Sequence, residues 1–125
     1  MIDHVALYVM DIDRSRRFYE EALEPLGYSV VHAGESFVGF AHDGTFRFAI
    51  RSGSGSGSDP TTTAHVAFEA EDRSAVDAFH AAAMSAGGSD RGAPGVREQR
   101  GPSCYAAFVT DPDGNNIEAV CNAHE

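Results

Sequence analysis

The chain has 125 residues, of which 42% are hydrophobic and 10% aromatic, and this size and composition predict one globular domain. Nine Lys and Arg against nineteen Asp and Glu give a net charge of −10, which argues against nucleic acid and anionic membranes as partners. No apolar run reaches the length of a transmembrane helix, and the first residues lack the basic stretch of a secretory signal. We therefore expect a cytoplasmic protein.

The first half of the chain predicts a strand, a helix and three further strands. After a strand over 2–9, the acidic and hydroxyl-rich segment 11–15 is typical of a helix N-terminus. Apolar residues then recur at helical spacing, and Gly27 ends the helix. Three strands are predicted over 28–33, 36–41 and 45–51. Residues 1–51 thus form a first βαβββ module.

Residues 52–60 read SGSGSGSDP and separate this module from the rest of the chain. Such a segment has few side chains to bury, so the composition predicts a flexible linker.

The second half repeats the first. A shift of 61 residues superposes His4-Val5-Ala6 on His65-Val66-Ala67, and a shift of 70 superposes Asp43-Gly44 on Asp113-Gly114. Matches in the same order at a fixed shift indicate duplicated units, and the difference between the shifts places an insertion within 89–103. Strands over 63–70, 94–97, 103–110 and 115–121 and one helix make 61–125 a second βαβββ module. The whole is an α+β domain.

Strand alternation assigns side chains to faces. His4 and Tyr8 lie on the face of the first strand that points away from the helix, and His65 and Glu69 lie on the matching face of the repeated strand. The two histidines occupy equivalent positions, so a twofold pairing of the modules would bring them together.

Glu118 interrupts an apolar strand that includes Ile117 and Val120. A buried carboxylate is costly unless it is paired or binds a metal. With His4 and His65 it would complete a set of two histidines and one carboxylate, which suits a divalent metal with open positions for substrate. The alternative is an ion pair with an arginine such as Arg47 or Arg51.

The chain resembles the vicinal oxygen chelate superfamily, which includes lactoylglutathione lyases, extradiol dioxygenases, fosfomycin-resistance thiol transferases and bleomycin-resistance proteins. The resemblance rests on IDHVALYV at the start, HVAFEA in the middle and FVTDPDGNNIEAV at the end. It implies two paired βαβββ modules that form a cupped mixed sheet around one divalent metal ion, with Fe, Mn, Ni, Zn and Mg as the possible ions. The ligand positions of the family correspond to His4, His65 and Glu118.

Lactoylglutathione lyases use a fourth protein ligand on the last strand of the first module. The shift of 70 maps Glu118 onto Phe48, and the strand TFRFAI contains no carboxylate. Lactoylglutathione lyase activity is therefore not expected. We predict instead that Phe46, Phe48 and Ile50 face the site and favour an apolar or aromatic ligand.

Two functions remain open. In the first, the protein is a dioxygenase-like, lyase-like or thiol-transferase-like enzyme, whose metal acts as a Lewis acid on a small oxygen-chelating substrate. Tyr8 and Tyr105 are then candidates for an orienting hydroxyl or proton donor, and Glu69 for a general base. In the second, the protein binds an antibiotic or another small molecule without metal, and its acidic charge suits a cationic drug. We expect a homodimer, whose modules pair either within one chain or between two.

Overall fold

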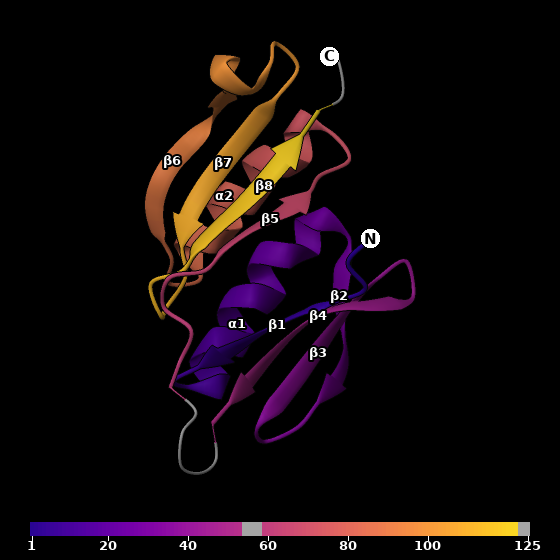
Figure 1. Ribbon diagram of the computed structural model, residues 1–125, viewed down its shortest axis with the longest axis vertical. Coiled ribbons are helices and arrows are strands. Elements are labelled where there is room, and N and C mark those ends of the chain that lie inside the picture. The colour runs from indigo at the N-terminus through magenta and orange to yellow at the C-terminus, as the bar shows by residue number, and fades with distance from the viewer. Residues whose placement is uncertain (54–58, 123–125) are drawn as a thin grey trace.

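The computed structural model describes residues 1–53 and 59–122, so part of the predicted linker lies outside the described residues. Each half of the chain has the order βαβββ that the sequence predicts (Figure 1). The elements of the first half are β1 (Val5–Val9), α1 (Ile12–Leu23), the 3-10 helix η1 (Glu24–Leu26), β2 (Tyr28–Ala33), β3 (Phe37–His42) and β4 (Thr45–Ser52). Those of the second half are β5 (His65–Glu69), α2 (Arg73–Ser85), β6 (Ser89–Val96), the 3-10 helix η2 (Glu98–Arg100), β7 (Tyr105–Thr110) and β8 (Asn116–Cys121).

The strands form two four-stranded mixed sheets with the same order. The first sheet runs β1-β4-β3-β2 and the second runs β5-β8-β7-β6. In each sheet the edge strand β1 or β5 is parallel to its neighbour, and the other pairs are antiparallel. The α+β architecture of two βαβββ modules is confirmed.

Acidic caps begin both long helices. The Asp11 carboxylate accepts hydrogen bonds of 3.1 Å from the backbone N–H groups of Asp13 and Arg14, and Asp72 accepts one of 2.8 Å from Ala75. These bonds satisfy amide donors that have no partner within the first turn of a helix. After η1 the chain turns at Gly27, whose φ of 89° is readily adopted only by glycine.

The first strand after α2 is longer than the sequence predicts. The sequence predicts a strand over 94–97, whereas β6 begins at Ser89 and pairs with β7. Its sequence, SDRGAPGV, is rich in Gly and Pro, but pairing with a neighbouring strand overrides that weak local preference. Register shifts between Asp90 and Gly92 and between Gly92 and Gly95 interrupt its pairing with β7.

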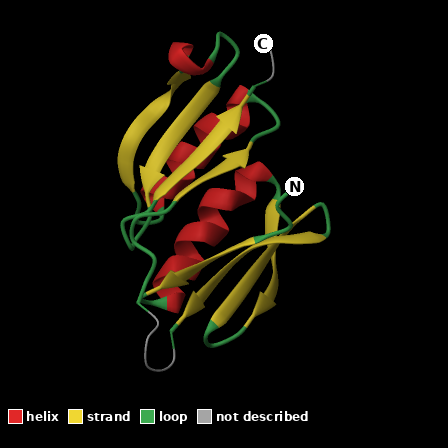
Figure 2. Cartoon of the chain, viewed as in Figure 1, coloured by secondary structure: helices red, strands yellow, loops and turns green. Residues whose placement is uncertain are grey.

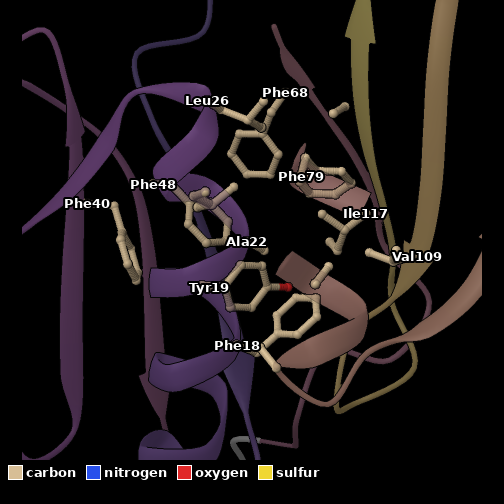
Figure 3. Packing of buried hydrophobic residues seen from close by; sticks show 14 of the residues in the cluster. Phe18, Tyr19, Ala22, Leu26, Phe40, Phe48, Phe68, Phe79, Val109 and Ile117 are labelled. Atoms are coloured by element: carbon tan, nitrogen blue, oxygen red, sulfur yellow. The ribbon is translucent and has the colours of Figure 1, made fainter. Parts of the chain in front are cut away.

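One hydrophobic core joins the modules. Phe18 and Tyr19 of α1 and Phe79 of α2 lie between the two sheets, with Phe48 on one side and Ile117 on the other (Figure 3). The helices therefore pack between the sheets. The helix-facing sides of both sheets share this core, and their opposite faces, called here the outer faces, point away from it (Figure 2).

A network of buried hydrogen bonds connects the turn between β7 and β8 to the first module. The Tyr19 hydroxyl donates to the Asp111 carboxylate, whose Oδ1 accepts from the backbone N–H groups of Asp113 at 2.9 Å and Asn115 at 2.8 Å. The Asn115 side chain in turn donates to the Thr61 carbonyl at 2.6 Å. Burial raises the pKa of Tyr19 well above its ordinary value, and the neighbouring Asp111 charge raises it further. Tyr19 therefore stays a protonated donor.

We predict that Tyr19→Phe lowers the free energy of unfolding by about 1–3 kcal/mol, because a buried acceptor of Asp111 loses a partner. Urea denaturation measures the change. Tyr8→Phe is the matched control, since no hydrogen bond of the Tyr8 hydroxyl is formed among the described residues. Equal stability of the two variants would contradict a structural role for this bond.

Candidate functional site

A buried carboxylate on the outer face of the second sheet is the centre of the candidate site. Glu118 is 1% exposed, its Oε1 lies 2.8 Å from His65 Nε2, and its Oε2 accepts a hydrogen bond of 2.6 Å from Arg100 Nη1. The parallel register of β5 and β8 pairs Ala67 with Glu118, and His65, two residues before Ala67, lies on the same face. The prediction that His65 and Glu118 lie together agrees with this geometry.

Arg100, at the end of η2, is the cation that pairs with Glu118. The hydrogen bond and the charge of Glu118 raise the pKa of the Arg100 guanidinium above its ordinary value. The ion pair with an arginine, the alternative to a metal in the sequence analysis, is thus present, but its partner is Arg100 and not Arg47 or Arg51. Arg47 donates to the Asp3 carbonyl at 2.9 Å, and Arg51 lies over the Tyr8 and Phe37 rings of the first sheet. Arg100 lies within 89–103, the range that contains the insertion, so the repeat gives no signal for it.

The third predicted ligand, His4, lies on the other module. Its Nδ1 is 2.8 Å from Asp3 Oδ1, and its ring centroid is 4.9 Å from that of Phe46. It has no contact with His65 or Glu118 among the hydrogen bonds and ring pairs of residues 1–53 and 59–122. Within those residues no group of three or more His, Cys, Asp or Glu side chains is arranged to hold a metal ion.

A β-bulge changes the face assignment of β4. Phe40 pairs with Phe48 and the next residue, Ala41, pairs with Phe46, so one extra residue of β4 lies between the two pairs. A bulge of this kind breaks strict alternation. Phe46 accordingly lies beside His4 on the outer face, whereas Phe48 and Ile50 are buried in the core. The prediction that Phe48 and Ile50 face the site is wrong.

The register also corrects the position equivalent to Glu118 in the first module. Glu118 pairs with Ala67, and the repeat counterpart of Ala67 is Ala6, which pairs with Ala49. The equivalent position is therefore Ala49 and not Phe48. The absence of a fourth carboxylate from this strand is unchanged.

Tyr105 lies on the wrong face for the role that the sequence analysis gave it. Its hydroxyl donates to Asp77 of α2 at 2.6 Å, and the guanidinium of Arg73 lies 5.0 Å from its ring centroid. Tyr105 pairs with Cys121, an odd number of residues from Glu118, and alternation points it toward the helix. Tyr105 therefore points away from Glu118 and is not a candidate for a proton donor at this site.

Tyr8 and Glu69 lie on outer faces but apart from Glu118. Tyr8 is 38% exposed on β1, where it contacts Arg51. Glu69 lines a different cavity of about 910 Å³ together with Tyr28 and Arg47. Burial raises the pKa of Tyr28, Arg47 opposes this and Glu69 adds to it. Among the described residues, neither Tyr8 nor Glu69 has a side-chain hydrogen bond to His65 or Glu118.

Comparison with known families and structures decides the family. The model described as the Glyoxalase/Bleomycin resistance protein/Dioxygenase superfamily matches residues 1–119. The chain belongs to this superfamily. No curated protein sequence matches it.

Solved structures agree with the family. A glyoxalase/bleomycin resistance protein from Albidiferax ferrireducens T118 is 32% identical over 97% of this chain and 98% of its own, with a TM-score of 0.79. A putative glyoxalase from Bacillus halodurans is 25% identical over 97% and 95% of the two chains, with a TM-score of 0.73. The fosfomycin resistance protein FosX from Mesorhizobium loti is 20% identical over 97% and 91%, with a TM-score of 0.66, and this likeness shows the fold alone.

Members of this superfamily bind small molecules, often dimerise and often use a divalent metal. In the part of the chain that the structure describes, no helix has the length and apolar character needed to cross a membrane.

We predict that Arg100→Met lowers the free energy of unfolding by roughly 1–3 kcal/mol, because the buried Glu118 charge loses its strongest partner, while the half-exposed arginine limits the effect. The double variant with Glu118→Gln should be more stable than Arg100→Met alone, since the uncompensated charge is gone. Chemical denaturation of the wild type, both single variants and the double variant yields the coupling energy. Additive effects would show that the two side chains do not interact.

Proposed function

We propose that this protein is a metal-dependent enzyme that acts on a small oxygen-chelating substrate. In this proposal one divalent ion is held by His65 and Glu118 of one copy and by His4 of a second copy. The observation that carries the proposal is the pair formed by Glu118 Oε1 and His65 Nε2, 2.8 Å apart on adjacent strands of an outer face.

The donor set fits a divalent metal in part. An imidazole nitrogen and a carboxylate oxygen are ligands that Zn, Mn, Fe and Ni accept. Arg100 engages Oε2 of Glu118, and Oε1 remains beside His65 for a metal. Two donors from one chain do not complete a site, so a further donor is required.

A second copy is the natural source of that donor. The helices pack between the two sheets of one chain, so the outer face with His4 and the outer face with Glu118 point away from each other. Both histidines are about half exposed, with side-chain exposures of 50% for His4 and 53% for His65. A twofold arrangement of two chains would place the first module of one against the second module of the other. We therefore propose a homodimer with its sites between chains.

When bound, the ion would supply Lewis-acid chemistry toward two oxygens of the substrate. Arg100 fixes the orientation of the Glu118 carboxylate through its hydrogen bond. Phe46 beside His4 and Phe108 beside His65 would give the site apolar walls. Tyr8 stays the proposed proton donor and Glu69 the proposed base, although neither side chain has a hydrogen bond to His65 or Glu118 among the described residues of one chain. We propose that the enzyme acts in the cytoplasm.

The reaction class remains dioxygenase-like, lyase-like or thiol-transferase-like. Lactoylglutathione lyase activity is not proposed, because Ala49 stands where a fourth carboxylate would be required.

A metal-free binding protein is the second candidate function. The observation that favours it is the 2.6 Å hydrogen bond from Arg100 to Glu118, because a guanidinium compensates the buried charge without a metal. Metal analysis of protein purified without chelator separates the two functions. A stoichiometric divalent ion supports the enzyme, and a metal-free protein that binds a small molecule supports sequestration.

Complementation between variants tests the shared site. We predict that His4→Ala and His65→Ala each bind the metal poorly, because each loses one ligand per site. Mixed dimers should regain one intact site, formed by His4 of one chain and His65 with Glu118 of the other. The measurement is metal content after the two proteins are unfolded together and refolded.

Two outcomes contradict this prediction. If the mixture binds no more metal than either variant, the site is not shared between chains. If His4→Ala alone keeps full metal content while folded, His4 is not a ligand.

A separate prediction concerns activity. The metal-loaded protein should not isomerise the hemithioacetal of methylglyoxal and glutathione above background, because the fourth ligand is missing at Ala49. Absorbance of the thioester product is the measurement. Robust turnover would overturn the argument from the ligand count.

A further inference from the structure

An arginine-lined cavity adjoins the buried carboxylate on the outer face of the second sheet. Its volume is about 600 Å³, and its walls come from the bulged strand β6, from η2 and from β7. The lining residues are Arg91, Gly92, Ala93, Pro94, Arg97, Gln99, Arg100 and Phe108. Three of the nine basic residues of the chain gather here, and no carboxylate is among the lining residues. The cavity is therefore a positively charged region of a protein whose net charge is −10.

Arg97 is held in position inside this cavity. Its Nη2 donates to the Ala93 carbonyl at 2.6 Å, and its guanidinium lies 5.3 Å from the centroid of the Phe108 ring. A flat guanidinium on an aromatic face keeps its remaining N–H donors directed outward at its edge. Arg97 therefore presents a fixed fork of donors.

Two glycines make room for that guanidinium. A Cβ atom at Gly92 would lie 3.2 Å from Arg97 Nη2 and 2.9 Å from Phe108 Cδ1, and one at Gly95 would lie 3.4 Å from Arg97 Nη1. A side chain at Gly92 would require the Phe108 ring or the Arg97 guanidinium to move, whereas one at Gly95 would only contact the guanidinium. The absence of a side chain at Gly92 thus leaves room for Arg97 against the Phe108 ring.

The positive charges of the cavity are only partly compensated. Within the described part of the chain, no carboxylate lies within 4.0 Å of Arg91 or Arg97, and Arg100 is paired with Glu118 through a single nitrogen. A guanidinium carries five N–H donors, so all three arginines have donors left for a ligand. Arginine forks match the geometry of carboxylate and phosphate oxygens.

Phe108 connects the cavity to the candidate site. It pairs with Glu118 across β7 and β8, and its ring centroid is 6.1 Å from that of His65. A ligand whose oxyanion lies on Arg97 would extend its apolar part along Phe108 toward His65.

We infer that this cavity binds the oxyanion of a small organic acid, which is either a carboxylate or a phosphonate. The ligand of this protein is then an anion. The inference deepens the proposed function by giving the substrate class of the same outer face. It rests on the arginines and not on a bound metal. It replaces the cationic ligand that the overall charge of the chain suggests.

The inference is tested by measuring the binding of benzoate, phenylphosphonate and inorganic phosphate. The full chain is used as purified and is kept in excess chelator. Titration is followed by amide NMR shifts. We expect the three anions to shift the amide signals of residues in β6 and β7 and to bind more weakly as the salt concentration rises. Benzamidinium, a cation of the same shape as benzoate, should not bind in the cavity. Benzoate and phenylphosphonate that bind better than phosphate would indicate contact with Phe108.

Arg97→Gln should weaken benzoate binding by roughly tenfold or more, the loss expected for a charge-assisted hydrogen bond. The matched control is Arg17→Gln on the exposed side of α1, which removes the same charge away from the cavity and should leave affinity unchanged. Equal effects of the two variants, or binding of benzamidinium as strong as that of benzoate, would overturn the inference. Because chelator is present throughout, failure here leaves the metal proposal standing, and failure of metal binding leaves this result intact.

Discussion

The buried charge of Glu118 is the constraint on which the candidate site depends. A carboxylate that is 1% exposed cannot remain charged at low cost without partners. His65 on the neighbouring parallel strand and Arg100 from the insertion each engage one of its oxygens. The strand register supplies the first partner, and the extra residues of the second module supply the second. The strand register and the extra residues of the second module together lower the cost of burying the Glu118 charge.

The arrangement of the modules decides what that charge can do. Because Tyr19, Phe48 and Phe79 share one core between the sheets, the outer faces of a single chain diverge. Glu118 and His65 therefore face outward, and in the proposed function they supply only part of the ligand set. The same packing explains why a protein with repeated histidines at equivalent positions does not bring them together within one chain, and why a second copy enters the proposed function.

Much of the fold could be predicted from the sequence. The repeat, the acidic cap in segment 11–15 and the Gly27 turn are signals in the sequence, and each appears where expected. The cost of a buried carboxylate and the repeat of the histidines predict that Glu118 and His65 lie together, and the register of two regular strands places them side by side. The face assignment failed at Phe48 and Ile50, because the shift of 70 maps Glu118 onto Phe48 whereas the strand register makes Ala49 its counterpart. The bulge in β4, which leaves no mark in a single strand, is why Phe46 nevertheless lies on the outer face. Arg100 was missed for another reason: its segment has no counterpart in the first module.

The central claim is that His65 and Glu118, with His4 of a second copy, form one divalent metal site. Side-chain ¹H–¹⁵N spectra of the histidines during addition of substoichiometric Mn²⁺ test it most directly. The account predicts that the imidazole signals of His4 and His65 broaden together and first, before those of other histidines such as His80. Broadening of His65 without His4, or of surface histidines ahead of both, would contradict it.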